Sequence, residues 1–101
     1  WTEHTIVTNF GGARSVDAKD MDGDGDIDLA GAALSDHEIA WWRNDGGSPI
    51  NWTKITINST FTWAHKVQIV DMDKDGKQDI LGTAFGNGLS WWKNDGVDTV
   101  I

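Results

Sequence analysis

Two short acidic runs hold the residues whose type and spacing best fit a chemical role. Both follow the pattern DxDxDGxxD, the first over residues 20–28 and the second over residues 71–79. Aspartates at positions 1, 3 and 5 of a tight loop converge on one point, glycine at position 6 permits the turn, and position 7 offers a backbone carbonyl. Because Ca²⁺ needs roughly six to eight oxygen ligands, each run predicts a calcium site.

The predicted ligands occupy the odd positions of each run. They are Asp20, Asp22, Asp24, Asp26 and Asp28 in the first loop, and Asp71, Asp73, Asp75, Lys77 and Asp79 in the second. The residue at position 7 would bind the ion through its backbone carbonyl, so the carboxylate of Asp26 is not needed as a ligand. The second loop has Lys77 at this position, and we therefore expect it to bind calcium more weakly. An EF-hand is excluded, because position 12 is glycine in both runs and flanking helices are missing. The alternatives are Mg²⁺, which keeps its waters, and a solvated acidic turn without metal.

Composition and charge exclude several classes of protein. The 101 residues include 8 Lys and Arg against 16 Asp and Glu, a formal charge of −8, which argues against nucleic-acid binding. Nine of these acidic residues lie in the two loops. No apolar run reaches the ~20 residues of a membrane helix, and no signal-peptide pattern is visible. Cysteine is absent, which excludes disulfides, zinc–thiolate sites and a cysteine nucleophile.

The loops belong to an internal repeat that fills the chain. The sequence matches itself when it is shifted by 51 residues, or by 50 after a one-residue gap near Asp36. The matches include Trp1-Thr2 with Trp52-Thr53, Asp20-Met21-Asp22 with Asp71-Met72-Asp73, Trp41-Trp42 with Trp91-Trp92, and Asn44-Asp45-Gly46 with Asn94-Asp95-Gly96. We therefore divide the chain into a first repeat, residues 1–50, and a second repeat, residues 51–101.

Each repeat predicts four short strands and no helix. The expected strands cover residues 4–7, 13–19, 27–34 and 38–43 in the first repeat, and residues 55–57, 65–70, 78–85 and 89–93 in the second. Alternating or small apolar residues mark the strands, and Gly, Asn, Asp and Ser separate them. Four antiparallel strands in about 50 residues is the size of a β-propeller blade, so we predict an all-β fold with two four-stranded blades.

Such blades need neighbours on both faces. The adjacent Trp41 and Trp42 point to opposite faces of their sheet, so both faces are apolar. Propellers have roughly 4–8 blades, so we expect a ring of several chains, or a piece of a longer propeller. If residues 51–58 complete the first blade, residues 1–8 supply the outer strand of a neighbouring chain's second blade. Three chains would then give roughly six blades, or four chains roughly eight.

These features resemble the FG-GAP/VCBS repeats. The resemblance rests on a DxDxDGxxD loop after an Ala-Arg-Ser-Val strand, followed by Ile-Ala-Trp-Trp-Arg-Asn-Asp-Gly, and it covers essentially the whole chain twice. It implies integrin-type β-propeller blades whose calcium ligands are the loop residues given above. The family includes adhesion proteins, polysaccharide-degrading proteins and propeller lectins, and it usually joins more blades in one chain than this sequence provides.

A ligand site, rather than a catalytic one, is expected where the repeats differ. No serine spacing indicates a triad, and the aspartates lie in metal loops rather than in a glycosidase pair, so we predict no enzyme activity. Residues 12–14, Gly-Ala-Arg, correspond to Trp-Ala-His at 63–65. The candidate ligand-binding residues are Trp63, His65, Arg14, Asp36 and His37. Aromatic rings stack on sugars and polar groups bond hydroxyls; the alternative roles are packing for Trp63 and a solvated turn for His37.

Two classes of function remain. The first is a calcium-stabilised β-propeller binding module, with about two structural Ca²⁺ ions per chain and lectin-like carbohydrate recognition in pockets between blades. Its expected partners are further copies of itself and carbohydrate. Its expected location is outside the cell, where loops with dissociation constants of about 10⁻⁴–10⁻³ M are filled. The alternative is a non-catalytic structural or protein-interaction scaffold, or a fragment of a larger propeller, without its own sugar site.

Overall fold

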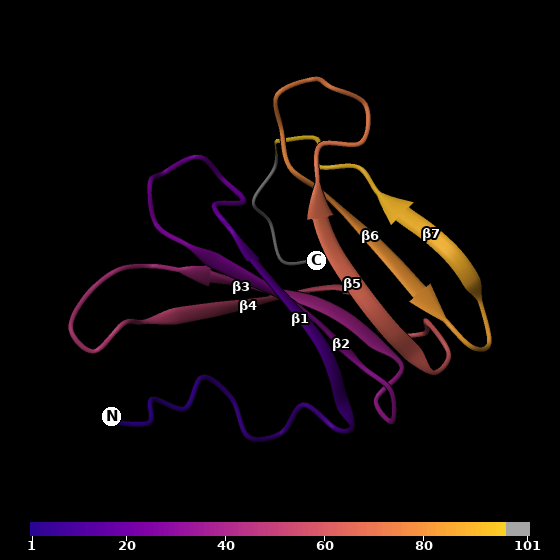
Figure 1. The fold of residues 1–101 in the computed structure, drawn as a ribbon, viewed down its shortest axis with the longest axis horizontal. Helices are drawn as coiled ribbons and strands as arrows, with labels where there is room; N and C mark the ends of the chain where they lie inside the picture. The colour runs from indigo at the N-terminus through magenta and orange to yellow at the C-terminus, as the bar shows by residue number, and fades with distance from the viewer. Residues whose placement is uncertain (97–101) are drawn as a thin grey trace.

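The computed structural model describes residues 1–96 and shows an all-β chain with two antiparallel sheets (Figure 1). The first sheet has the order β1-β2-β3-β4, with β1 Ala13–Lys19, β2 Asp28–Ala33, β3 Glu38–Asn44 and β4 Trp52–Asn58. The second has the order β5-β6-β7, with β5 Ala64–Val70, β6 Asp79–Ala84 and β7 Gly88–Trp92. Residues 97–101, the end of the second repeat, lie outside the described residues. Within residues 1–96 there is no helix with the length and apolarity of a membrane span.

The sequence pattern located most of the strands. Apart from β4, which is longer than predicted, each strand begins and ends within one residue of its expected range, because alternation and turn residues mark both ends. Residues 4–7, which were predicted to be a strand, form none in this single chain. The second sheet accordingly has three strands among the described residues, where four were predicted. A strand exists only with a hydrogen-bonded neighbour, and residues 4–7 pair with no described strand.

Strand β4 belongs to the first sheet although it lies in the second repeat. It pairs with β3, so that Ile55 lies opposite Trp41 and Thr53 lies opposite Arg43. This confirms that residues 51–58 complete the first sheet. The second sheet ends at β7, and no strand among residues 1–96 pairs with the outer edge of β7.

The hydrophobic core lies between the two sheets. Its buried side chains come from both sheets and include Ile39, Trp41, Ile55, Ile69 and Ile80. Polar contacts join the first strands of the two sheets: the backbone N–H of Ile69 donates to Asp17 Oδ2 at 2.7 Å, and Lys19 Nζ donates to the Ile69 carbonyl at 2.7 Å. Apolar burial therefore drives the packing of the sheets, and these directional bonds fix how β5 lies along β1.

One aromatic packing unit occurs in both sheets. The rings of Phe10 and Trp42 meet edge to face with centroids 4.8 Å apart, and those of Phe61 and Trp92 do the same at 5.0 Å. Each tryptophan lies over a glycine of the neighbouring strand. A Cβ atom on Gly31 would come within 2.9 Å of the Trp42 ring, so a side chain there would displace the ring. The repeat is thus a repeat of packing as well as of sequence.

Candidate metal centres and aromatic rim

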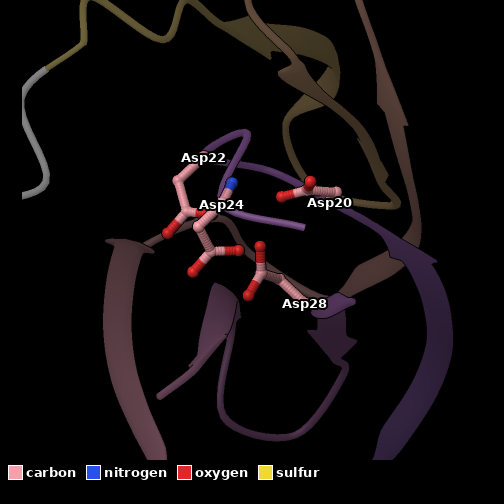
Figure 2. Close-up of side chains that lie close together, drawn as sticks. All are labelled: Asp20, Asp22, Asp24 and Asp28. Atoms are coloured by element: carbon pink, nitrogen blue, oxygen red, sulfur yellow. The ribbon is translucent and has the colours of Figure 1, made fainter. Parts of the chain in front are cut away.

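Each acidic loop gathers four carboxylates at one end of its sheet. The cluster of the first loop, shown in Figure 2, has oxygens within 4.8 Å of one another and consists of Asp20, Asp22, Asp24 and Asp28. The cluster of the second loop consists of Asp71, Asp73, Asp75 and Asp79. The two remaining predicted ligands, Asp26 and Lys77, are not members of these clusters, and their role through backbone carbonyls stays a prediction.

Backbone hydrogen bonds hold the last carboxylate of each loop. Asp28 is fully buried and accepts the N–H groups of Met21 and Asn44, both at 2.8 Å. Asp79 is equally buried and accepts the two corresponding N–H groups at 2.9 and 2.8 Å. Buried carboxylates are stable only when such partners are present, so each of these aspartates joins the loop to the strands around it.

Left-handed backbone conformations close both loops. The glycine at position 6 has φ 92° in each, at Gly25 and Gly76. At position 4 the first loop has Gly23 with φ 76°, whereas the second has Lys74 with φ 61°. Because only glycine adopts this region without steric cost, the glycine at position 6 has the turn-forming role that the sequence predicts for it.

The carboxylates of the first loop differ in their pKa values. Burial, reinforced by the charge of Asp28, raises the pKa of Asp22 to about 6. Burial also raises the pKa of Asp28, whereas the N–H of Gly25, which donates to Asp20 Oδ2 at 2.9 Å, lowers the pKa of Asp20. Full ionisation of the cluster is therefore unfavourable without a cation, and a bound dication would reverse that balance.

A lysine balances the charge of the second loop. Lys93 Nζ contacts the Asp73 carboxylate and donates to Asp75 Oδ2 at 2.9 Å. The N–H of Lys77, together with Lys93, lowers the pKa of Asp75 to about 2, and the two carboxylates raise the pKa of Lys93 above its usual value. The role of Lys93 was not predicted from the sequence, although Arg43 occupies the corresponding position of the first repeat.

The donor set of each cluster fits calcium. Carboxylate oxygens are hard ligands, and four of them from one tight loop suit a cation that takes most of its ligands from the protein. Mg²⁺ fits less well because it retains several waters. The four aspartates of each cluster would hold the ion, which would neutralise their charge and fasten the turn between β1 and β2 or between β5 and β6.

Aromatic residues gather at the opposite end of the sheets. Trp63 is 52% exposed and has φ 56°, a conformation that is rare for a bulky residue. Its N–H donates to His37 Nδ1 at 2.9 Å, and its carbonyl accepts the N–H of Phe85 at 3.1 Å. The His65 ring lies 4.7 Å from the Phe85 ring, and His65 Nδ1 is buried without a hydrogen-bond partner among the described residues. We call these four residues the aromatic rim.

The rim contains three of the five predicted ligand residues. The other two, Arg14 and Asp36, belong to the corresponding corner of the first sheet, where Gly12 has φ 68° in the place of the rim tryptophan. Phe85 was not predicted. Its counterpart in the first repeat is Leu34, so the signal that marks it is another position at which the repeats differ.

A groove separates the sheets on the side of the acidic loops. It has a volume of about 760 Å³ and is lined by residues that include Asp22, Trp41, Ile57, Lys77 and Trp92. The sequence predicted a ligand pocket between blades, but the residues predicted to bind the ligand do not line this groove. The rim and the groove are therefore two separate candidate surfaces.

The comparisons with known proteins agree with the geometry of the loops. A family model described as FG-GAP-like repeat matches residues 20–82, from the first acidic loop, through the second, into β6. The match covers more than half of the chain. Neither a curated protein nor a solved structure matches this chain.

Proposed function

Because the chain belongs to the FG-GAP-like repeat family, we propose that it is a calcium-stabilised β-propeller module that binds carbohydrate and has no catalytic activity. The observation that carries this proposal is the aromatic rim, in which an exposed tryptophan is held in an unfavourable backbone conformation. FG-GAP repeats occur typically in extracellular proteins. That setting supports a location outside the cell, where calcium is abundant.

The rim has the physical properties of a sugar platform. Trp63 and Phe85 expose apolar rings on which the C–H faces of a sugar can stack, and the His65 ring packs against the Phe85 ring from below the surface. A left-handed conformation costs a residue other than glycine about 1–2 kcal/mol. In the first repeat Gly12 adopts the corresponding conformation without this cost. A tryptophan kept at a position that glycine would fill more favourably is a reason to infer function.

Calcium has a structural role in this proposal. The acidic loops precede β2 and β6, and the rim lies at the other ends of those strands, so an ion in either loop would not touch a sugar on the rim. The ion would instead stabilise the folded sheets that carry the rim. Sugar binding would then depend on calcium only through the stability of the fold.

The test is a glycan array in calcium, followed by calorimetry with the bound sugar. In Trp63→Gly, glycine suits the left-handed conformation and restores the residue of the first repeat. We expect a loss of sugar affinity of at least about tenfold, or about 1.4 kcal/mol, without a loss of thermal stability. Ile50→Ala, which alters another exposed apolar residue, is the control and should bind normally.

Two outcomes would contradict the proposal. If Trp63→Gly binds the sugar normally, the rim is not the binding site, and the groove between the sheets becomes the candidate. If no glycan gives a signal while the folded chain still responds to calcium, the module does not recognise carbohydrate. That second result would favour the alternative function, a scaffold for protein interactions.

A further inference from the structure

The outer face of the second sheet is apolar and exposed. It contains Leu89, which is 69% exposed, and Trp91, which is 42% exposed. Their counterparts in the first repeat, Ile39 and Trp41, are only 0% and 7% exposed because the second sheet packs on them. We call the surface formed by Leu89 and Trp91 the bare face. It matches, position by position, the face on which the first sheet receives its neighbour.

The first sheet carries the complementary surface on its own outer side. Val16 on β1 is 68% exposed, whereas its counterpart Val67 on β5 is 7% exposed at the junction of the sheets. The aromatic pair of Phe10 and Trp42 has the same geometry as the corresponding pair in the second sheet. The first sheet therefore presents the kind of surface that the second sheet uses for docking.

The outer edge of the second sheet lacks the strand that completes the first sheet. In the first sheet β4 occupies that edge, and residues 1–8 are its sequence counterpart. Residues 1–8 form no strand here, and Figure 1 shows them running away from the sheets, with β7 on the other side of the molecule. This N-terminal segment therefore cannot reach β7 of its own chain in the structure shown.

We propose that residues 1–8 of one copy pair with β7 of a second copy, while the first sheet of the donor docks on the bare face of the acceptor. The same connection already exists within one chain, where β4 pairs with β3 and leads directly into β5 of the packed second sheet. Because each copy uses two different surfaces, the association is head to tail, and it forms a ring when the rotation from copy to copy divides a full turn.

The register of β3 with β4 predicts the register of the joined strands. Ala40 lies opposite Thr56 in the first sheet, so Ser90 should lie opposite Thr5 of the second copy. Because the chain has no cysteine, Ser90→Cys with Thr5→Cys introduces the only thiols. Residues directly opposite each other in an antiparallel pair have Cβ atoms about 4.5–5.5 Å apart, close enough for a disulfide to form with small adjustments.

Mild oxidation of this double variant should give a covalent oligomer of three or four chains on a denaturing gel, with almost complete loss of the monomer band. The control is Ser90→Cys with Glu3→Cys, which lies on the same strand face but two residues out of register, about 7–8 Å from its target. This control should cross-link at least about tenfold more slowly. Equal cross-linking of both pairs, or of neither, would overturn the proposed pairing.

The bare face is tested by light scattering in calcium. The unaltered chain should have three or four times the 11.1 kDa mass of one chain, and Leu89→Glu should reduce it to the mass of one chain. Leu89 is exposed in the single chain, so the variant should keep its circular dichroism spectrum. Ile50→Glu, at an exposed apolar residue in the connection between β3 and β4, is the control and should stay oligomeric. A monomeric unaltered chain, or an oligomer insensitive to Leu89→Glu, would overturn the proposal.

Discussion

The two acidic loops hold the same four carboxylates in the same backbone frame but balance their charge in different ways. In the second loop Lys93 bridges Asp73 and Asp75. In the first, the corresponding cation is Arg43, which pairs with Asp45 at 2.6 Å, beyond the four clustered carboxylates. The second loop therefore has a cation of its own in contact with two predicted ligands, whereas in the first loop desolvation and the charge of Asp28 raise the pKa of Asp22.

This difference indicates that two loops of the same backbone shape can differ in their affinity for calcium. The backbone bonds to Asp28 and Asp79 are nearly identical, so both loops take the same shape. A calcium ion entering the first loop relieves repulsion directly. An ion entering the second must first displace Lys93, so we expect the first loop to bind calcium more tightly.

The largest expected effect tests the buried carboxylate that both loops share, Asp28 in the first and Asp79 in the second. Asp28→Ala would leave the buried N–H groups of Met21 and Asn44 without an acceptor, at about 1–3 kcal/mol each, so the free energy of unfolding should fall by about 2–6 kcal/mol. Asp79→Ala should cost less, because Met72 is exposed and water can solvate its N–H. Urea denaturation with a chelator measures both losses without any contribution from metal.

The control for these variants is Asp26→Ala. Asp26 belongs to the same loop but not to the carboxylate cluster, so its removal should change the free energy of unfolding by less than about 0.5 kcal/mol. If Asp28→Ala were as mild as this control, the buried carboxylate would not support the loop. A larger loss for Asp79→Ala than for Asp28→Ala would show that burial of the N–H donors does not set the difference.

An intermediate effect is expected from removing the lysine. Exposed ion pairs are weak, and Lys93 makes two of them, so Lys93→Met should raise the calcium affinity of the second loop by up to about tenfold. Calorimetric titration with calcium should then show two sites of more similar affinity. Lys74→Gln removes the same charge from the same loop at an exposed position and should change the affinity less. Equal effects of both variants would mean that only net charge matters.

The sequence was sufficient to predict the strands and the clusters because both depend on local spacing. Aspartates two residues apart in a glycine turn converge whatever surrounds them, and Asp28 could be identified by its position in the pattern alone. The contact of Lys93 with Asp73 was not predictable in this way. It spans 20 residues and depends on how the end of β7 lies beside the loop, which only the packed sheet determines.

The exposure of equivalent residues could not be predicted either. Leu89 and Ile39 occupy the same place in their repeats, and nothing in either segment shows that one is exposed and the other buried. That difference depends on which sheet has a neighbour within the chain. Trp63, in contrast, could be singled out as a candidate ligand residue from the sequence, because its counterpart in the first repeat is Gly12, and the structure leaves it 52% exposed. Its role in ligand binding stays a prediction.

The smallest expected effect is a pH dependence that distinguishes the two loops without metal. The pKa of Asp22 is raised from 3.8 to about 6 by burial and by the neighbouring Asp28 and Asp24 carboxylates, so the folded chain binds a proton more readily than the unfolded chain. With a chelator present, stability should therefore rise as the pH falls from 7 through 6 and level off near 4. The gain should be modest because only a small part of the Asp22 side chain is withdrawn from solvent, which screens its charge.

Asp75 should affect stability in a different pH range, and its effect should have the opposite sign to that of Asp22. Its pKa is lowered from 3.8 to about 2, so the stability that it contributes is present above about pH 4 and is lost as the pH falls towards 2. Thermal melts between pH 7 and 4 with a chelator should thus report the first loop, and Asp22→Asn should flatten their pH dependence while Asp73→Asn leaves it in place.

In saturating calcium the trend should reverse, because protons then compete with the ion for Asp22. A chelated chain whose stability falls steadily from pH 7 to 5 would show that repulsion in the first loop is relieved by something other than protons or calcium, and the contrast between the loops would be lost.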